Sequence, residues 1–373
     1  MSALKLRAGT VVQAQREHPG EQRLLVELED GERRPAIADT RLHGDCALGD
    51  KVVVNVQALD IGLGSGGFDV LHVNLTRGLL GESSQGSPAP DQAANVSQAM
   101  KLNYTSLQHL VDPVDGVAAL ELPVSLPVGV LALHGQLAAV AWAYAQERPR
   151  GRLGYVQTAG GALPGGHSRA VAALRERELL SGHLSAGVSY GGEGEAITIA
   201  GAIHHGARSL GWDAIVCGPG PGIVGSGSPL GNGGLQALES AHTALALGAP
   251  TLLVARMSSA DPRARHRGVS HHTLTVLELL LAPVAVALPL GVEPPVGGDS
   301  CAQPGGTSRP GQRDASRHDW RSAPVDLAGY AASGLPSTTM GRGIAEDPLF
   351  FAAALAGGSA LASLCQAVQA RNA

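Results

Sequence analysis

The residues best suited to chemistry in this sequence gather within residues 255–273, ARMSSADPRARHRGVSHHT. Guanidinium groups bind phosphate and carboxylate groups through paired hydrogen bonds. For any single arginine a solvated basic loop is the simpler interpretation, but the cluster as a whole predicts an anion site. The ligand-binding residues predicted here are Arg256, Asp261, Arg263, Arg265, His266, Arg267 and Ser270.

Two adjacent histidines close this stretch, and they are the predicted proton-transfer residues. Ser270 fits a helix N-cap, which puts His271 and His272 in the first helical turn. The positive end of a helix disfavours imidazolium, so both rings are expected to be neutral. His134 ends an earlier predicted strand and is the third catalytic candidate. A buried, hydrogen-bonded structural role for His134 is an equal alternative.

The same stretch holds ligands that a metal ion could use. Asp261, His266, His271 and His272 lie within twelve residues, and catalytic zinc sites use three such ligands. Adjacent helical residues project about 100° apart, the i, i+4 spacing is missing, and neighbouring arginines repel a cation. We therefore expect no tightly bound metal. The sequence identifies no cofactor.

A glycine-rich stretch over residues 213–234, DAIVCGPGPGIVGSGSPLGNGG, is a second candidate for anion binding. A buried strand precedes it and a helical pattern follows it, so its backbone N–H groups could approach an anion. Its match to G-x-G-x-x-G is weak, because the helix begins too late and no acidic residue follows at the required distance. A flexible loop is the alternative. The predicted ligand-binding residues are Gly220, Gly222, Gly225, Ser226, Gly227 and Ser228.

Two further residues lie outside these stretches. Arg342, in TMGR, is added to the ligand-binding set, with simple solvent exposure as the alternative. Ser168 follows Gly166-His167, but a nucleophile elbow needs a strand directly before it and a glycine two residues later. An N-cap is the better interpretation of Ser168.

Strands and helices that alternate from about residue 126 must position these groups. Apolar runs predict strands at residues 128–133, 153–158, 214–217, 251–255 and 284–288, and helical patterns at residues 196–210 and 235–245. This alternation predicts an α/β fold with a Rossmann-like, doubly wound parallel sheet. The segments after strands, at residues 159–167, 218–234 and 256–270, are long. They should meet at the carboxyl edge of the sheet.

The rest of the chain divides around this domain. Five short β-rich runs within residues 9–75 predict a small N-terminal β-barrel of the OB or SH3-like kind. The expected parts are a barrel (1–77), a linker and connecting segment (78–117) and the α/β domain (118–373), with a disordered insertion at 293–322. Without basic or aromatic clusters, the barrel is better suited to docking or dimerisation than to nucleic acid.

The composition of the chain argues against two classes of partner, nucleic acids and membranes. A net charge of −5 and only three Trp, five Tyr and three Phe argue against nucleic acid. Four cysteines without C-x-x-C spacing, no signal peptide and no uninterrupted apolar span predict a cytoplasmic protein without a membrane partner. The three lysines all lie at or before Lys101, which excludes a P-loop lysine. A homo-oligomer is left open.

Four stretches together resemble an uncharacterised bacterial family known as domain of unknown function 3866. They are GPGPGIVGSGSPLG, SSADPRARHRGVSHHTLT, LDIGLGSGGFDVLHVNLTRG and STTMGRGIAEDPLFF. The likeness covers most of the chain, barrel included, but not residues 293–322. It implies that the two domains occur together in bacteria, and it assigns no catalytic role to any residue.

These observations support two hypotheses about function. The first is an enzyme, a hydrolase or transferase, that acts on a small phosphorylated or carboxylated molecule with histidine acid/base chemistry. The alternative is a non-catalytic docking or regulatory protein with a metabolite-sensing cleft. An enzyme requires two titratable side chains within about 3–4 Å of each other beside an open pocket.

Overall fold

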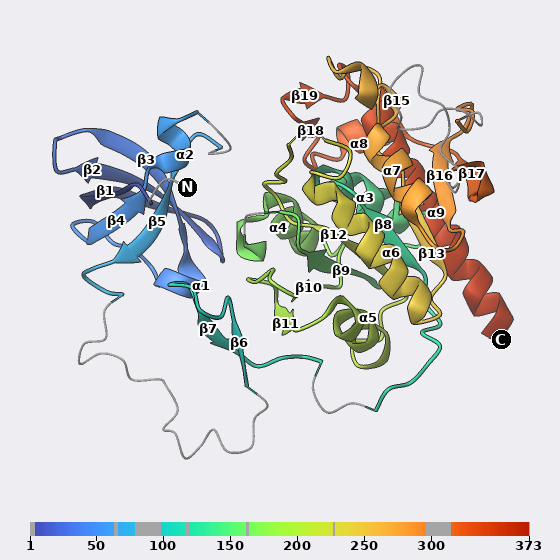
Figure 1. The fold of residues 1–373 in the computed structure, drawn as a ribbon, viewed down its shortest axis with the longest axis horizontal. Helices are drawn as coiled ribbons and strands as arrows, with labels where there is room; N and C mark the ends of the chain where they lie inside the picture. Colours follow the sequence, from blue (N-terminus) through green and yellow to red (C-terminus); the bar gives the residue numbers. More distant parts are fainter. Residues whose placement is uncertain are drawn as a thin grey trace. The chain divides into compact units, whose positions relative to one another are not determined.

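The computed structural model describes residues 4–62, 66–78, 98–115, 119–161, 164–226, 228–295 and 315–372. Contacts divide the chain into two compact units (Figure 1). The first comprises residues 1–112 with 164–167, and the second comprises residues 113–163 with 168–373. Gly227 and residues 296–314 of the predicted insertion lie outside the described residues.

The first unit contains the predicted barrel, which is closed. Its strands are β1 (Leu6–His18), β2 (Glu21–Leu28), β3 (Arg33–Asp39), β4 (Lys51–Asn55) and β5 (Asp69–Asn74), in the order β1-β2-β3-β5-β4. Alternate strand residues point inward, and they include Val26, Val54 and Leu71, which are fully buried. The short helices α1 (Thr40–His43) and α2 (Gln57–Asp60) join strands. A five-stranded closed barrel is the arrangement of OB folds.

Beyond the barrel, the chain forms a hairpin that the sequence did not predict. Strands β6 (Ala99–Lys101) and β7 (His109–Val111) pair antiparallel within the segment expected to be a linker. Each strand has only three residues, which is too short for a period-2 pattern to be recognised.

The second unit is built on one eight-stranded sheet whose neighbouring strands are all parallel. The strand order is β11-β10-β9-β12-β8-β13-β16-β17. The bounds are β8 (Val128–Leu131), β9 (Leu153–Thr158), β10 (Gly182–Ala186), β11 (Gly194–Ala196), β12 (Ala214–Pro219), β13 (Thr251–Val254), β16 (Ala285–Pro289) and β17 (Asp319–Ala323). Central strands are buried throughout, as expected for a sheet covered on both faces.

Helices cover both faces of the sheet, which confirms the doubly wound α/β fold (Figure 1). On one face lie α5 (Ile199–Arg208), α6 (Gln236–Ala246) and α7 (His271–Leu279). On the other lie α3 (Leu137–Glu147), α4 (Arg169–Glu176), α8 (Leu327–Ala332) and α9 (Pro348–Asn372). By length and composition α9 could span a membrane, but 78% of its apolar window is buried. Its buried residues pack in the core of the second unit.

The sequence did not predict three strands of this sheet, β10, β11 and β17. One of them, β17, shortens the segment that was predicted to be disordered. β17 begins at Asp319, inside the stretch 293–322 that was predicted to be disordered. It lies at the sheet edge and most of its side chains are exposed, so its sequence DWRSA has no apolar run. β10 (GHLSA) is buried throughout and β11 (GEA), at the opposite edge, is partly buried, but neither short sequence contains an apolar run that predicts a strand.

Candidate functional site

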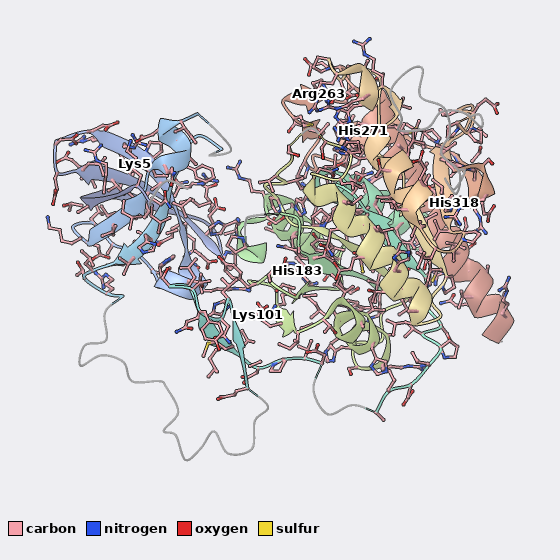
Figure 2. All side chains as sticks on the ribbon, in the orientation of Figure 1. Lys5, Lys101, His183, Arg263, His271 and His318 are labelled. Carbon is pink, nitrogen blue, oxygen red and sulfur yellow. The ribbon has the colours of Figure 1, made fainter. Side chains whose placement is uncertain are left out.

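Three neighbouring strands end at the candidate site. β8 lies between β12 and β13, and its successor in the chain, β9, lies beyond β12. The direction of winding therefore changes at β8, and such a switch point opens a crevice at the carboxyl edge. His134 follows β8, the glycine-rich loop follows β12, and Arg256 follows β13. Figure 2 shows Arg263 and His271 together at this end of the unit, whereas His318 lies beside β16 and β17.

A cavity of about 480 Å³ lies where these segments meet. The glycine-rich loop and the arginine- and histidine-rich loop therefore do converge, as their positions after parallel strands predict. All of the lining residues belong to the second unit. The lining comprises Leu133, His134, Gly135, Pro221, Gly222, Ile223, Val224, Gly225, Asn232, Arg256, Arg263, Arg265, His266, His272, Thr339 and Met340.

The glycine-rich loop forms backbone bridges within itself and with the loop after β9. Gly225 bridges Asn232, and Ile223 bridges Gly161 in the loop after β9. Gly222 has a φ of 80°, a left-handed conformation that favours glycine. Of the loop residues predicted to bind ligand, Gly222 and Gly225 line the cavity, whereas Gly220, Ser226 and Ser228 do not. At Gly220 a Cβ atom would lie 2.3 Å from Gln157 Nε2, so the buried Gln157 side chain would have to shift if this glycine were replaced.

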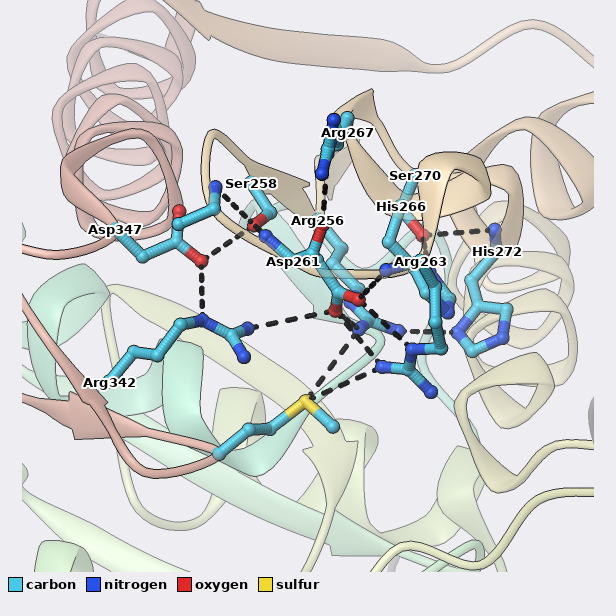
Figure 3. Close-up of polar contacts among 12 residues, drawn as sticks. Arg256, Ser258, Asp261, Arg263, His266, Arg267, Ser270, His272, Arg342 and Asp347 are labelled. Atoms are coloured by element: carbon cyan, nitrogen blue, oxygen red, sulfur yellow. Dashed lines mark hydrogen bonds and ion pairs between the residues drawn. The ribbon is translucent and has the colours of Figure 1, made fainter.

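Arg256 connects the cavity to the histidines. Its guanidinium is buried and donates a hydrogen bond of 2.8 Å to His272 Nδ1 (Figure 3). His272 must therefore be a neutral ring that accepts at Nδ1. Burial, together with the charges of Arg263 and Arg342, lowers the pKa of Arg256 to about 10. Arg256 still carries its positive charge at neutral pH.

Asp261 organises the arginines and does not itself line the cavity. Its fully buried carboxylate accepts two hydrogen bonds of 2.9 Å from Arg263 (Figure 3). It also forms longer ion pairs with Arg256 at 3.5 Å and Arg342 at 3.6 Å. The hydrogen bonds from Arg263 hold the pKa of Asp261 well below its usual range. One carboxylate thus orients three guanidinium groups.

Three histidine rings form a compact group. His266, in the 3-10 helix η5 (Ala264–His266), lies 4.7 Å from the His271 ring and 4.8 Å from the His272 ring, between centroids. Ser270 is the N-cap of α7, as predicted, and its Oγ lies 2.8 Å from His266 Nδ1.

The pKa values of this group agree with the expected neutral rings. Burial and nearby arginine charges lower the pKa of His266 and of His272 to about 3, and they also lower that of His271. Burial is the largest cause for all three, so the helix terminus is not the main reason. His266 and His272 line the cavity, whereas His271 is buried behind them.

His134 lines the cavity, and both of its ring nitrogens contact other residues of the second unit. Its Nδ1 lies 3.2 Å from the carbonyl oxygen of Pro219, and its Nε2 lies 2.7 Å from Ser168 Oγ. The carbonyl can only accept, so Nδ1 carries the proton and Nε2 accepts the serine hydroxyl. Burial lowers the pKa of His134 to about 4. Ser168 is the N-cap of α4, as predicted, and accepts from the Val171 N–H.

The C-terminal segment contributes neighbours of Arg342 rather than Arg342 itself. Strands β18 (Thr338–Thr339) and β19 (Arg342–Gly343) form a short hairpin whose turn brings Met340 to the cavity. Arg342 instead donates to Asp347, which is fully buried and accepts from Ser258 Oγ (Figure 3).

Arg267 also lies outside the cavity lining. Its Nε donates to the carbonyl oxygen of Asp261. Arg267 and Arg342 thus both contact Asp261 outside the cavity lining.

Sequence reasoning missed the apolar part of the lining. Leu133, Pro221, Ile223, Val224 and Met340 lie in the cavity wall, each next to or near a residue that was predicted. Their position next to or near His134, Gly222 and Arg342 is the one feature of the sequence that could have identified them. Aliphatic side chains between glycines carry no chemical signature, however, so only the fold identifies them as lining residues.

Comparison with known proteins identifies a family. A protein-family model described as Protein of unknown function (DUF3866) matches residues 35–358, which covers most of the chain. The matched region includes the glycine-rich loop, the basic loop and the C-terminal hairpin. No curated protein and no solved structure matches the chain.

Proposed function

Since the chain belongs to the DUF3866 family, whose description assigns no activity, we propose a function from the cavity: it binds a small molecule that carries a phosphate or carboxylate group. The observation that carries this proposal is the gathering of Arg256, Arg263 and Arg265 around one cavity. Asp261 is the only carboxylate that pairs with them among the described residues. The three arginines therefore leave an excess of positive charge.

Arg265 is the side chain best placed to meet an incoming anion. It is exposed, lines the cavity and makes no ion pair with any described residue. The guanidinium of Arg263 is already shared with Asp261, and that of Arg256 with His272. These two arginine side chains are already held in place before an anion arrives. Binding therefore costs little additional side-chain entropy.

The wall of the cavity indicates the chemistry of the part of the ligand that lies beyond its anionic group. Leu133, Ile223, Val224 and Met340 give the cavity an apolar side. Its volume of about 480 Å³ suits a small organic molecule. We therefore favour an organic phosphate or organic acid with an apolar portion over a bare inorganic ion.

Acid/base chemistry is proposed for His272 and His134. The 2.8 Å contact between Arg256 and His272 places two titratable side chains beside the cavity, which favours an enzyme over a docking protein. An anion that engages Arg256 would free His272 Nδ1 to accept a proton. With a phosphorylated ligand, such chemistry corresponds to a hydrolase or a transferase in the cytoplasm.

A thermal-shift screen tests this proposal. We expect one or more of inorganic phosphate, sugar phosphates, acyl phosphates and dicarboxylates to raise the melting temperature, because a ligand that binds only the folded state stabilises it. In Arg265→Gln the shift should fall, with about a tenfold loss of affinity. Arg150→Gln, which changes an exposed arginine outside the cavity, is the matched control.

Turnover separates the two hypotheses. Each stabilising compound is incubated with the protein and its products are followed by mass spectrometry. Consumption that is lost in His272→Gln supports the enzyme, whereas binding without consumption supports the metabolite-sensing alternative. If no anion shifts the melting temperature, or if Arg265→Gln and Arg150→Gln behave alike, the proposal is wrong.

A further inference from the structure

We propose that His266, His271 and His272 bind a divalent transition-metal ion of the zinc class at the inner end of the cavity. This inference goes beyond anion binding and does not depend on it, because all three ligands come from the protein. Each ring offers one nitrogen, and these three nitrogens lie within 4.8 Å of one another. Three protein ligands with a fourth position open to solvent are typical of catalytic zinc sites.

Two ring nitrogens of these histidines support a ligand role. The Nε2 atoms of His266 and His271 are buried and have no hydrogen-bond partner. Burying a polar atom without a partner is unfavourable, and buried polar groups of this kind are uncommon in folded proteins. A metal ion would satisfy both at once.

The surroundings of His266 also fit a metal ligand. Its Nδ1 lies 2.8 Å from Ser270 Oγ, and Ser270 is fixed as the N-cap of α7. A metal-bound histidine usually has its second nitrogen hydrogen-bonded to a fixed group, which orients the ring. Ser270 would thus direct His266 Nε2 toward the other rings.

The sequence argues against a metal on two grounds, spacing and charge. In the structure the spacing argument loses its force, because His266 comes from η5 and not from α7. The His266 ring packs against the rings of both His271 and His272. Two nitrogens bound to one zinc ion lie at most about 4.2 Å apart. A separation near 4.8 Å therefore requires at least one ring to move by a few tenths of an ångström.

The charge argument remains and gives the inference its sharpest consequence. Arg265 lines the same cavity as His266 and His272, so its charge must repel a cation bound to these rings. The same arginine should attract an anion in the cavity. Replacing it should therefore strengthen zinc binding and weaken phosphate binding, two effects of opposite sign in one variant.

His272 adds a further consequence, because its Nδ1 already accepts from Arg256. A neutral imidazole has one accepting nitrogen. If the metal binds Nδ1 it replaces this hydrogen bond, and if it binds Nε2 the proton moves to Nδ1, which can then no longer accept. The contact between Arg256 and His272 should therefore be altered in the metal-bound protein.

The test uses the full chain, purified without a histidine tag. The protein is treated with a chelator, dialysed against zinc, and measured for metal content by mass spectrometry. We expect about one zinc ion per chain. We also expect the visible absorption of a tetrahedral site when cobalt(II) replaces zinc. His266→Gln and His271→Gln should each weaken binding at least tenfold.

His205→Gln is the matched control, since His205 lies on α5 and lines a different cavity. Circular dichroism and the melting temperature establish that each variant is folded. Zinc content well below one ion per chain in the wild type overturns the inference. Equal zinc binding in His266→Gln and His205→Gln also overturns it.

Inorganic phosphate is titrated in parallel to separate this inference from the proposed function. Phosphate binding by a protein that takes up no zinc overturns the metal site and leaves the anion site standing. Zinc binding without phosphate binding upholds the metal site while the proposed function fails. Opposite changes in the two affinities in Arg265→Gln uphold both.

Discussion

At the scale of single residues, Asp261 holds the basic side chains of the cavity in place. We predict that Asp261→Ala destabilises the protein by about 3–5 kcal/mol, because it leaves several guanidinium groups, including the buried Arg256, without their carboxylate. Urea unfolding measures this change. Asp319→Ala is the control: Asp319 pairs with Arg321 at the surface, and such pairs contribute under about 1 kcal/mol. Equal losses in both variants would contradict the prediction.

His134 should give the protein a measurable dependence on pH. Its pKa in the folded state is about 4, below the ordinary value of 6.5. The unfolded chain therefore binds more protons between these values, and stability that is complete above pH 6.5 is lost as the pH falls toward 4. This group contributes up to about 3 kcal/mol of that loss.

The variant His134→Gln tests this dependence. It should be less stable than the wild type at pH 7, since it loses the hydrogen bonds to Ser168 and Pro219. The difference should narrow as the pH approaches 4.5, because the variant has no ring to protonate. Free energies of unfolding from urea titrations at several pH values measure the effect. Parallel curves for the two proteins would show that His134 is not responsible.

At the scale of elements, the loop after β12 combines a constrained backbone conformation with a proposed binding role. Gly222 has a φ of 80° and lines the cavity. Gly222→Ala should cost about 1–2 kcal/mol through backbone strain and should also reduce the thermal shift given by anionic ligands.

Gly291 offers a matched comparison for this loop. Its φ is 85° and a Cβ atom there would meet nothing within 4 Å, so strain is the only expected consequence of Gly291→Ala. The two variants should lose similar melting temperature, but only Gly222→Ala should lose ligand response. An unchanged response in Gly222→Ala would mean that this part of the loop does not contact the ligand.

At the scale of the whole molecule, the two units have separate cores and separate buried ion pairs. In the barrel, Arg34 donates to Asp69 at 2.6 and 2.9 Å, and the Asp69 side chain is fully buried. We predict that Asp69→Ala costs about 3 kcal/mol and increases amide hydrogen exchange in the barrel strands. Ligand response should not change, since no barrel residue lines the cavity.

The exposed pair in the same barrel provides the control. Asp30 pairs with Arg7 at the surface, so Asp30→Ala should cost under about 1 kcal/mol. Loss of ligand response in Asp69→Ala, with the α/β unit still folded, would show that the barrel influences the cavity.

The sequence by itself determined the elements that have strong local patterns. Apolar runs predicted β9 with its observed bounds and the other central strands to within a few residues. Ser168 and Ser270 were identified as N-caps because capping depends on neighbours a few residues away. The convergence of two long loops also followed from sequence, since parallel strands share one carboxyl edge.

Tertiary structure alone decided which residues reach the cavity. Arg342 was expected to bind ligand; in the structure it donates to Asp347 and does not line the cavity, whereas Met340 does. Asp261 pairs with Arg342 across some eighty positions of sequence. No local pattern records such a pairing, because it depends on where two distant segments pack. The edge strand β17 was missed because solvent covers most of its side chains, so burial imposed no pattern on its sequence.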